Sequence, residues 1–379
     1  MNKVFRKIHL WLSVPVGLII TVICLTGAAL VFERDITESL NPKIYTVAYP
    51  AGDTPLPPSE LVASIRQPVP DSLELLSLQL SGERDVACMA TFKGAGKRSL
   101  SVNPYTGEVN GWTKSYPFFQ TMRKLHRWLM DPPAYKGAKS AGKVIVGITT
   151  FVMVVILVSG IVIWIPRTRK ALRNRLVVSC TKGWWRFWYD SHVSLGLYVT
   201  LFLLVMALTG LTWSFQWYRT AAYGLFGVST ARPAMSAPQQ QNKDEKKEKA
   251  EFDYGIWDNV VSELQALYPS YASISLTAGK AQISKPGNMR SSDTAAFDTQ
   301  TGEITTVTAY SDVPRAQKMK GWFYAFHTGS WGGMTTKVLY FLAAFIGGIL
   351  PLSGYYLWLK KKRLSKKKVF RTIFETKCI

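Results

Sequence analysis

Four uncharged, apolar stretches constrain the fold of this chain more than any other feature of its sequence. They are Leu10–Phe32, Val144–Ile165, Val193–Phe215 and Val338–Leu359. About 20 apolar residues are enough for a helix to cross the hydrocarbon core of a bilayer, so each stretch predicts a transmembrane helix. The first stretch also resembles a secretory signal peptide, but its apolar run is too long and no clear cleavage site follows it. The sequence therefore predicts an integral membrane protein with four spans in the lipid bilayer.

The charge of the chain predicts which side of the membrane each connecting segment faces. The 379 residues carry a formal net charge of +22. Lysine and arginine cluster ahead of the first span, between the second and third, and after the fourth. Because cytoplasmic loops are enriched in basic residues, we expect these three segments and both termini inside the cell. Nucleic-acid binding is the alternative use of such charge, and no nucleic-acid motif supports it.

The cysteines exclude several kinds of metal centre. Cys24, Cys88, Cys180 and Cys378 are scattered and form neither CxxC nor CxxCH. This spacing excludes a zinc ribbon, an iron–sulfur cluster of the usual type and a covalently attached c-type haem.

The two long segments between spans, which we expect outside the cell, repeat one pattern. Each contains a helical pattern, three alternating runs and a turn of the form Asx-x-x-Thr-Gly-Glu. In the first segment these are Ser59–Arg66, Leu75–Leu80, Val86–Phe92, Ser99–Val102 and Asn103–Glu108. In the second they are Ile256–Leu267, Ser273–Leu276, Lys280–Ser284, Thr294–Phe297 and Asp298–Glu303. An Asx residue and a glycine with positive φ suit a tight turn between strands, and its recurrence at matching positions indicates duplication.

Duplication makes the first and third spans equivalent, and each carries a histidine and a glycine at the same spacing. His9 precedes Gly27 by 18 residues, and His192 precedes Gly210 by the same number. Eighteen residues are five helical turns and about 27 Å, so the two residues lie on one face of each helix. One end of that face offers a metal ligand, and the other offers bare backbone against which a flat group fits.

The other two histidines of the chain, His126 and His327, precede the second and fourth spans at the outer face. A pseudo-two-fold axis along the membrane normal then pairs His9 with His192 inside and His126 with His327 outside. The second span starts 18 residues after His126 and the fourth only 11 after His327, so it stays open whether the outer two share one depth. A single histidine in a membrane span is as often a hydrogen-bonded packing residue as a metal ligand. However, ionisable groups in spans are costly, and every histidine of the chain occupies one of these places.

Facing imidazoles in a helix bundle, with room for a plane, suit a b-type haem because neutral imidazole is a good axial ligand for iron. Small residues occur at both levels as candidates for packing against it. Gly27 and Gly210 lie near the outer histidines, and Gly160 and Gly354 lie near the inner ones. Close packing between helices is the alternative explanation for these glycines.

Basic side chains near both levels are candidates for pairing with haem propionates. We select Arg6 inside and Arg127 outside, with Arg186 inside and Arg123 and Lys124 outside as further candidates. Such residues also serve as plain interfacial anchors.

Several motifs resemble those of the PepSY-associated transmembrane family. They are Leu125–Trp128, His192–Leu211, His327–Ser330 and Ser353–Trp358, in the family's order. The resemblance covers nearly the whole chain, and its members include di-haem siderophore-iron reductases of the bacterial inner membrane. It implies two b-type haems, with His9 and His192 as axial ligands of the inner one and His126 and His327 of the outer one. Serine replaces threonine in the second and fourth Thr-Gly-like pairs, which is a mild departure.

This resemblance implies an oxidoreductase that passes electrons across the membrane to a ferric siderophore outside, releasing ferrous iron. The sequence has no flavin or nicotinamide fingerprint, so the electron donor is expected to be a quinol or a cytoplasmic reductase. An alternative function is a membrane-anchored PepSY-domain regulator or inhibitor of a periplasmic protease. A transporter is a third, but no span is obviously broken and no acidic residue lies in an apolar core.

The expected fold is an α-helical integral membrane protein. Its four-helix transmembrane bundle is built from two pseudo-symmetric halves, each with an α+β PepSY-like outer domain in the periplasm. The first half comprises span 1 (1–32), outer domain 1 (33–117) and an interfacial segment with span 2 (118–166), followed by a basic cytoplasmic loop (167–190). The second half comprises span 3 (191–218), outer domain 2 (219–320) with a disordered linker (231–251), an interfacial segment with span 4 (321–359) and a basic tail (360–379).

Overall fold

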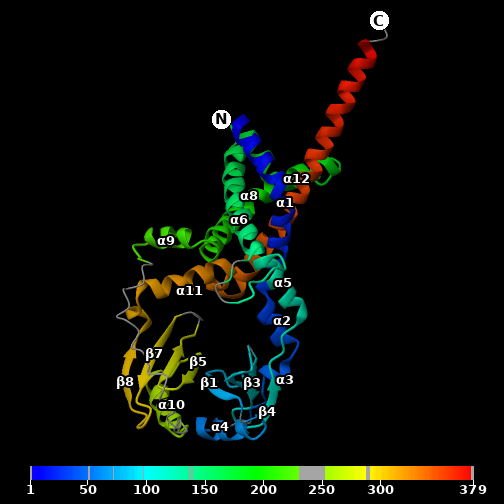
Figure 1. Cartoon of the computed structure of the whole chain (residues 1–379). Helices are drawn as coiled ribbons and strands as arrows, with labels where there is room; N and C mark the ends of the chain where they lie inside the picture. Colours follow the sequence, from blue (N-terminus) through cyan, green and yellow to red (C-terminus); the bar gives the residue numbers. More distant parts are fainter. Residues whose placement is uncertain are drawn as a thin grey trace. The chain divides into compact units, whose positions relative to one another are not determined.

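The computed structural model describes residues 2–49, 52–70, 72–96, 98–135, 138, 140–229, 252–286 and 291–376, with the backbone alone at residue 2 and from 365 onward. The chain forms two compact units (Figure 1). The helical unit comprises Met1–Glu33, Pro117–Gly227 and Phe323–Ile379. The sheet unit comprises Arg34–Tyr116 and Val228–Trp322. The linker expected at 231–251 lies outside the described residues.

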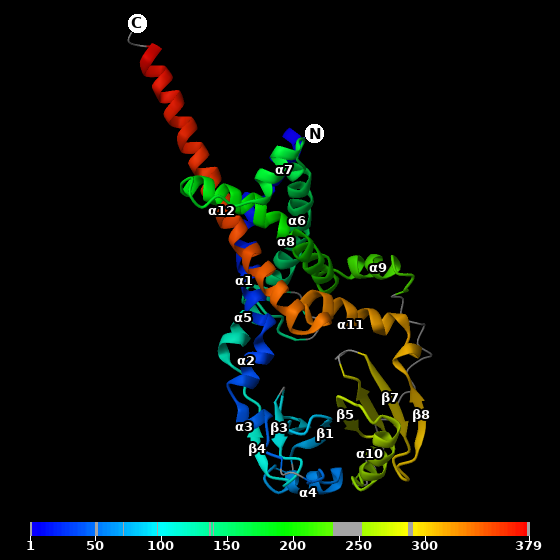
Figure 2. The same ribbon diagram turned by 180° about the vertical axis from the view of Figure 1, so that it is seen from behind.

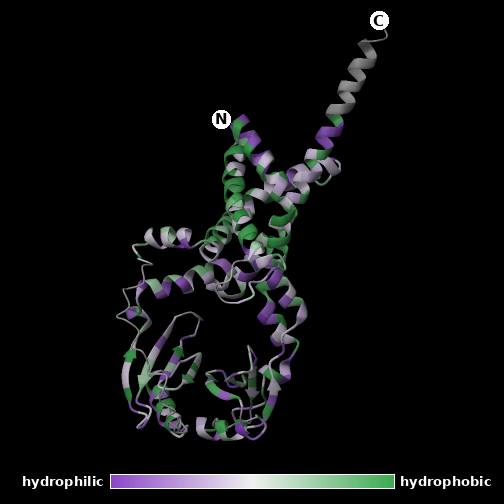
Figure 3. Ribbon diagram, in the orientation of Figure 1, coloured by the Kyte–Doolittle hydropathy of each residue, from purple (hydrophilic) through white to green (hydrophobic). Residues whose placement is uncertain are grey.

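Four long helices build the helical unit. They are α1 (Asn2–Val31), α6 (Ala141–Trp164), α8 (Trp184–Ser214) and α12 (Gly333–Thr376). Each contains a stretch long and apolar enough to cross a membrane, which confirms the four predicted spans. Hydrophobic residues dominate these stretches, and hydrophilic residues gather toward their ends (Figure 3). The apolar core between the helices takes side chains from all four of them, including Ile20, Met153, Leu203 and Ala343.

The helices extend beyond the apolar stretches that predicted them. Helix α8 begins at Trp184, inside the segment expected as a loop, and α12 continues to Thr376 through the expected basic tail. Lysine and arginine are good helix formers and are favourable near a helix C-terminus, which explains the extension of α12. A further short helix, α7 (Arg169–Leu176), lies beside the ends of α6 and α8 (Figure 2). His9 lies inside α1 and His192 inside α8, as their spacing to Gly27 and Gly210 predicted.

Short helices complete the helical unit. These are α5 (Pro117–Trp128), α9 (Gln216–Gly224), the part of α11 (Arg315–Thr328) that follows Trp322, and a 3-10 turn, η2 (Ser330–Gly332). Helix α5 packs against α1 and α6. Directly after α5 the chain reverses through Leu129 and Met130, which have left-handed φ values of 49° and 69°. The Asp131 carboxylate then accepts a hydrogen bond from the Gly142 backbone N–H at 2.9 Å, which ties this turn to the start of α6.

The sheet unit is built on one antiparallel sheet of eight strands in the order β4-β3-β2-β1-β5-β6-β7-β8. The first segment supplies β1 (Glu74–Ser81), β2 (Cys88–Lys93), β3 (Ser99–Val102) and β4 (Val109–Trp112). The second supplies β5 (Ser273–Thr277), β6 (Lys280–Ser284), β7 (Ser292–Phe297) and β8 (Ile304–Thr308). Strands β1 and β5 pair antiparallel, so the two segments expected as separate domains share one sheet.

Two helices cover one face of this sheet. They are α4 (Pro58–Arg66) and α10 (Ile256–Leu267), one from each segment. Leu61 and Ile65 of α4 and Trp257 and Leu264 of α10 are buried with the inward side chains of the strands. The Ser59 hydroxyl donates a hydrogen bond of 2.5 Å to the Asp258 carboxylate, which links the two helices. The two segments that form the sheet also contain three shorter elements, α2 (Glu33–Ser39), α3 (Pro42–Tyr45) and η1 (Tyr310–Asp312).

The two predicted turns have the same geometry. Asn103 and Asp298 each accept a side-chain hydrogen bond from the backbone N–H two residues on, at 2.9 Å and 2.7 Å. Gly107 and Gly302 have φ of 72° and 76°, the left-handed region that glycine adopts without steric cost. Each turn leads into a strand that the sequence pattern did not predict, β4 in the first segment and β8 in the second.

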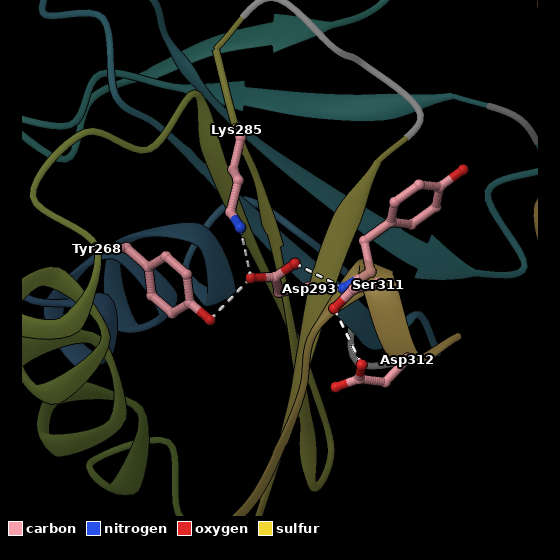
Figure 4. A network of polar contacts seen from close by, with 6 residues as sticks. Tyr268, Lys285, Asp293, Ser311 and Asp312 are labelled. Atoms are coloured by element: carbon pink, nitrogen blue, oxygen red, sulfur yellow. Dashed lines mark hydrogen bonds and ion pairs between the residues drawn. The ribbon is translucent and has the colours of Figure 1, made fainter. Parts of the chain in front are cut away.

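The buried carboxylate of Asp293 joins structural elements near the edge of the sheet that the second segment forms. Asp293 on β7 accepts hydrogen bonds from Lys285 Nζ at 2.9 Å, Tyr268 OH at 3.0 Å and the Tyr310 backbone N–H at 2.9 Å (Figure 4). Burial by itself raises the pKa of Asp293, but these bonds and the charge of Lys285 outweigh it and hold the pKa below its usual value. Asp293 therefore remains a carboxylate at neutral pH and joins β7 to η1.

Candidate cofactor site: two histidine pairs

The four histidines of the chain meet in two pairs within the helical unit. The ring centroids of His9 and His192 lie 6.3 Å apart with their planes at 89°. The ring centroids of His126 and His327 lie 6.1 Å apart with their planes at 52°. These are the pairs that the sequence repeat suggested. The outer two meet although their spacing to the next span differs, because the reversal after α5 folds that helix back against α1 and α6.

Each imidazole is held by a backbone carbonyl of a neighbouring helix. The Nδ1 atom lies 3.1 Å from Ile156 O in His9, 2.8 Å from Ile23 O in His126, 3.1 Å from Leu350 O in His192 and 2.9 Å from Met206 O in His327. A carbonyl oxygen only accepts, so Nδ1 carries the hydrogen and Nε2 keeps a free lone pair in all four rings. This is the tautomer that a metal-binding histidine needs.

We call the atoms of a neighbouring helix that receive an imidazole its seat. A hydroxyl group lies beside the carbonyl in each seat. Ser159, Ser353 and Thr209 place their hydroxyl oxygens 3.2, 2.8 and 3.2 Å from Nδ1 of His9, His192 and His327. Each of these hydroxyls donates to a carbonyl of its own helix, so its oxygen accepts from the imidazole N–H. Thr26 occupies the matching place near His126 and donates to Val22 O at 2.6 Å. Replacing threonine by serine therefore keeps the hydroxyl that the seat uses.

The four predicted glycines lie against histidine rings. A Cβ atom added to Gly27 or Gly210 would lie 2.9 or 3.1 Å from Cε1 of the outer histidines, His126 and His327. At Gly160 and Gly354 it would lie 3.4 and 3.5 Å from Cε1 of the inner ones. We expected these residues to pack against a planar cofactor. The structure places an imidazole carbon beside each of them.

The histidine pairs suit a planar metal cofactor better than a bare metal ion. Two imidazoles fill two coordination positions, whereas a zinc ion takes four ligands. Among the residues described, no group of three or more His, Cys, Asp and Glu side chains is placed to hold a metal. A macrocycle that supplies its own in-plane ligands needs only two axial donors, and the two pairs provide that number.

The basic residues considered as haem-propionate partners are either exposed or already form ion pairs with carboxylates. Arg6 is exposed. Arg127 is also exposed, with its guanidinium carbon 4.4 Å from the ring centre of Trp128. Arg186 binds the Asp190 carboxylate at 2.7 Å, and Arg123 binds Glu33.

Sequence reasoning did not select two further residues near the inner pair, Trp164 and Ser191. The indole Nε1 of Trp164 and the hydroxyl of Ser191 are buried and have no hydrogen-bond partner among the described residues. A repeated motif signals the tryptophan. Ser-Gly-x-x-x-Trp occurs at Ser159–Trp164 and again at Ser353–Trp358, one turn after each glycine that seats an inner histidine.

The comparisons with known proteins identify the family of this chain. The model of the family described as the PepSY-associated TM region matches residues 6–361. Among curated proteins no match is found. Since the family model covers nearly the whole chain and all four histidine motifs, this protein belongs to the PepSY-associated TM region family.

Proposed function

We propose that this protein is a di-haem b electron-transfer enzyme that reduces ferric siderophore in the periplasm and so releases ferrous iron. The observation that carries the proposal is the geometry of the two histidine pairs. Two metal–nitrogen bonds of about 2 Å each, with half an imidazole ring on either side, span about 6 Å. The ring centroids of the pairs lie 6.3 and 6.1 Å apart, with the metal-binding tautomer fixed at every histidine.

Haem bound in this way supplies one-electron chemistry between ferric and ferrous iron. His9 and His192 hold the inner group, and His126 and His327 hold the outer one. With two histidines to hold each haem, both sites would pass electrons and would not bind the substrate at iron. The carbonyl, hydroxyl and glycine of each seat fix the ring so that little rearrangement accompanies a change of charge.

The proposed direction of transfer is from the cytoplasmic side outward. The basic segments favour a topology with both termini in the cytoplasm of a bacterium and the sheet unit in the periplasm. A quinol or a cytoplasmic reductase would reduce the inner haem. The two levels are about 27 Å apart or less along α1 and α8, so no further cofactor is needed between them. The same arrangement of carbonyl, hydroxyl and glycine around a histidine recurs in both halves of the chain. This recurrence supports two pseudo-symmetric halves, each with a PepSY-like outer segment.

An anaerobic assay on the purified full-length protein tests this function. We expect two haems per chain by pyridine haemochrome, reoxidation of the reduced protein by a ferric siderophore, and ferrous iron in a chelator trap. His126→Ala or His327→Ala should stop this reoxidation while the inner haem remains bound and reducible. A colourless protein would instead favour the membrane-anchored regulator of a periplasmic protease. A reduced spectrum that persists with every ferric chelate would refute the reductase activity.

A further inference from the structure

Three buried side-chain donors in the described part of the chain have no hydrogen-bond partner there: Trp164 Nε1, Ser191 Oγ and Trp257 Nε1. Trp257 lies in the core of the sheet unit. The other two adjoin the inner histidine pair, since Trp164 follows the seat glycine Gly160 by one helical turn and Ser191 directly precedes His192. Burying a polar group without a partner costs free energy, so an acceptor from outside the protein is expected at these two positions.

Helix geometry places Trp164 on the same face of α6 as Gly160, the glycine beside His9. Residues four apart lie on one face of a helix, and helical side chains lean toward the N-terminus. Trp164 is therefore expected to cover the turn that contains Gly160, where an added Cβ atom would lie 3.4 Å from Cε1 of His9. Arg175 donates to the carbonyls of Ile163 and Trp164, which closes the end of α6 just beyond the indole.

The chemistry of the two donors defines their acceptor. An indole N–H only donates, so its partner must be an acceptor. An anionic oxygen forms the strongest hydrogen bonds with such donors, and a carboxylate held in a buried place requires them.

We infer that the Trp164 indole and the Ser191 hydroxyl bind a carboxylate side chain of the planar cofactor held between His9 and His192. This inference rests on the proposed haem function. It replaces the exposed Arg6 as the inner partner of a propionate by two neutral, buried donors. The inner cofactor would then be anchored at its edge as well as at its iron.

Haem release from the inner site tests this inference. The parent protein is full-length His327→Ala, which should retain the inner haem alone. Trp164→Phe and Ser191→Ala are each expected to transfer haem to excess apomyoglobin about tenfold faster than this parent, with a larger effect for the double variant. Ser194→Ala and Trp257→Phe are the controls. The first removes a hydroxyl that already donates to Leu176 O, and the second removes an unpartnered indole N–H in the sheet unit.

Rates equal to the parent rate in both test variants would show that the donors serve an ordered water, and would overturn the inference. Resonance Raman spectra with all four histidines intact give a second measurement. The propionate bending bands should shift in Trp164→Phe and Ser191→Ala and stay unchanged in the controls. Unshifted bands would also overturn the inference. If the unmodified protein binds no haem, the proposed function fails instead.

Discussion

At the scale of single residues, the chain holds a histidine in the same way four times. A carbonyl, a small residue and a neighbouring hydroxyl of one helix receive the ring of another. Each seat sits in a long helix whose backbone is already hydrogen-bonded, so the carbonyl that accepts from Nδ1 is fixed in place before any ligand arrives. The imidazoles are thus oriented by the protein alone.

The pairing predicts how haem is lost when a ligand is removed. His9→Ala and His192→Ala should each abolish the same inner haem, because each leaves the other imidazole without its partner across the site. The double variant should then lose no more haem than either single one, as measured by haem per chain. Additive loss in the double variant would show that the two histidines belong to different sites.

The glycine contacts predict a graded response to an added methyl group. Gly27→Ala and Gly210→Ala would bring Cβ within 2.9 and 3.1 Å of an imidazole carbon, closer than ordinary van der Waals contact. Overpacking of this kind costs about 1–3 kcal/mol, so we expect these variants to lose most of the outer haem. Gly160→Ala and Gly354→Ala meet the ring at 3.4 and 3.5 Å and should keep the inner haem. Equal haem content in all four variants would contradict a seat role for the outer glycines.

At the scale of elements, the structure differs most from the sequence pattern at the ends of helices and at the edges of the sheet. Helix α8 starts nine residues before the apolar stretch at Val193, and β4 and β8 follow turns whose second strands were not located from the sequence. These edges depend on tertiary contacts. Strand β7 is joined to η1 through the buried Asp293, whose partners are Lys285 after β6, Tyr268 after α10 and the Tyr310 backbone in η1.

The pKa of Asp293 predicts how acid weakens this edge. Its folded pKa lies below the ordinary value of 3.8, so the carboxylate stabilises the fold fully above that pH and loses this contribution as the pH falls through the folded pKa. Asp293→Asn should therefore speed hydrogen exchange of the 310–312 amides at neutral pH, a loss of about 1–3 kcal/mol of local protection. The difference from the unmodified protein should shrink in strong acid. Asp312→Asn, at an exposed side chain, is the control, and a difference that persists unchanged in acid would refute the role of the charge.

At the scale of the whole molecule, the two segments that follow the first and third spans combine in one sheet through β1 and β5. Strands β1 and β5 pair antiparallel, as neighbouring strands do within each segment. Neither of these two strands is therefore left as an unpaired edge. The outer part of the chain is therefore one folded unit that requires both segments.

The proposed topology predicts which cysteines a membrane-impermeant maleimide reaches. Cys180 is exposed between α7 and α8, so single-cysteine protein should be labelled only after spheroplasts are permeabilised. Gln300→Cys, at the exposed turn before β8, should be labelled in intact spheroplasts. Cys88 serves as a silent control, because it is 2% exposed and burial raises its pKa to about 12. Labelling of Cys180 in intact spheroplasts would overturn the orientation.

The four spans, the repeat in the two long connecting segments and the pairing of the histidines could be predicted from sequence patterns. Each of these depends on local pattern: apolar length, turn residues such as Gly107 and Gly302, and the equal spacing of His9 to Gly27 and His192 to Gly210. These patterns can be recognised without knowing which residues lie nearby in space, because helix length and backbone conformation depend on residues within a few turns along the chain.

Only the tertiary structure decided what each glycine touches and which atoms hold each ring. The seat of His9 is made by α6, 147 residues away at Ile156, and no local pattern specifies that contact. The same holds for the single sheet formed by both segments and for the unpartnered donors of Trp164 and Ser191. Contacts between distant segments depend on how whole helices and strands pack, since side chains meet across elements whose relative placement the local sequence does not encode.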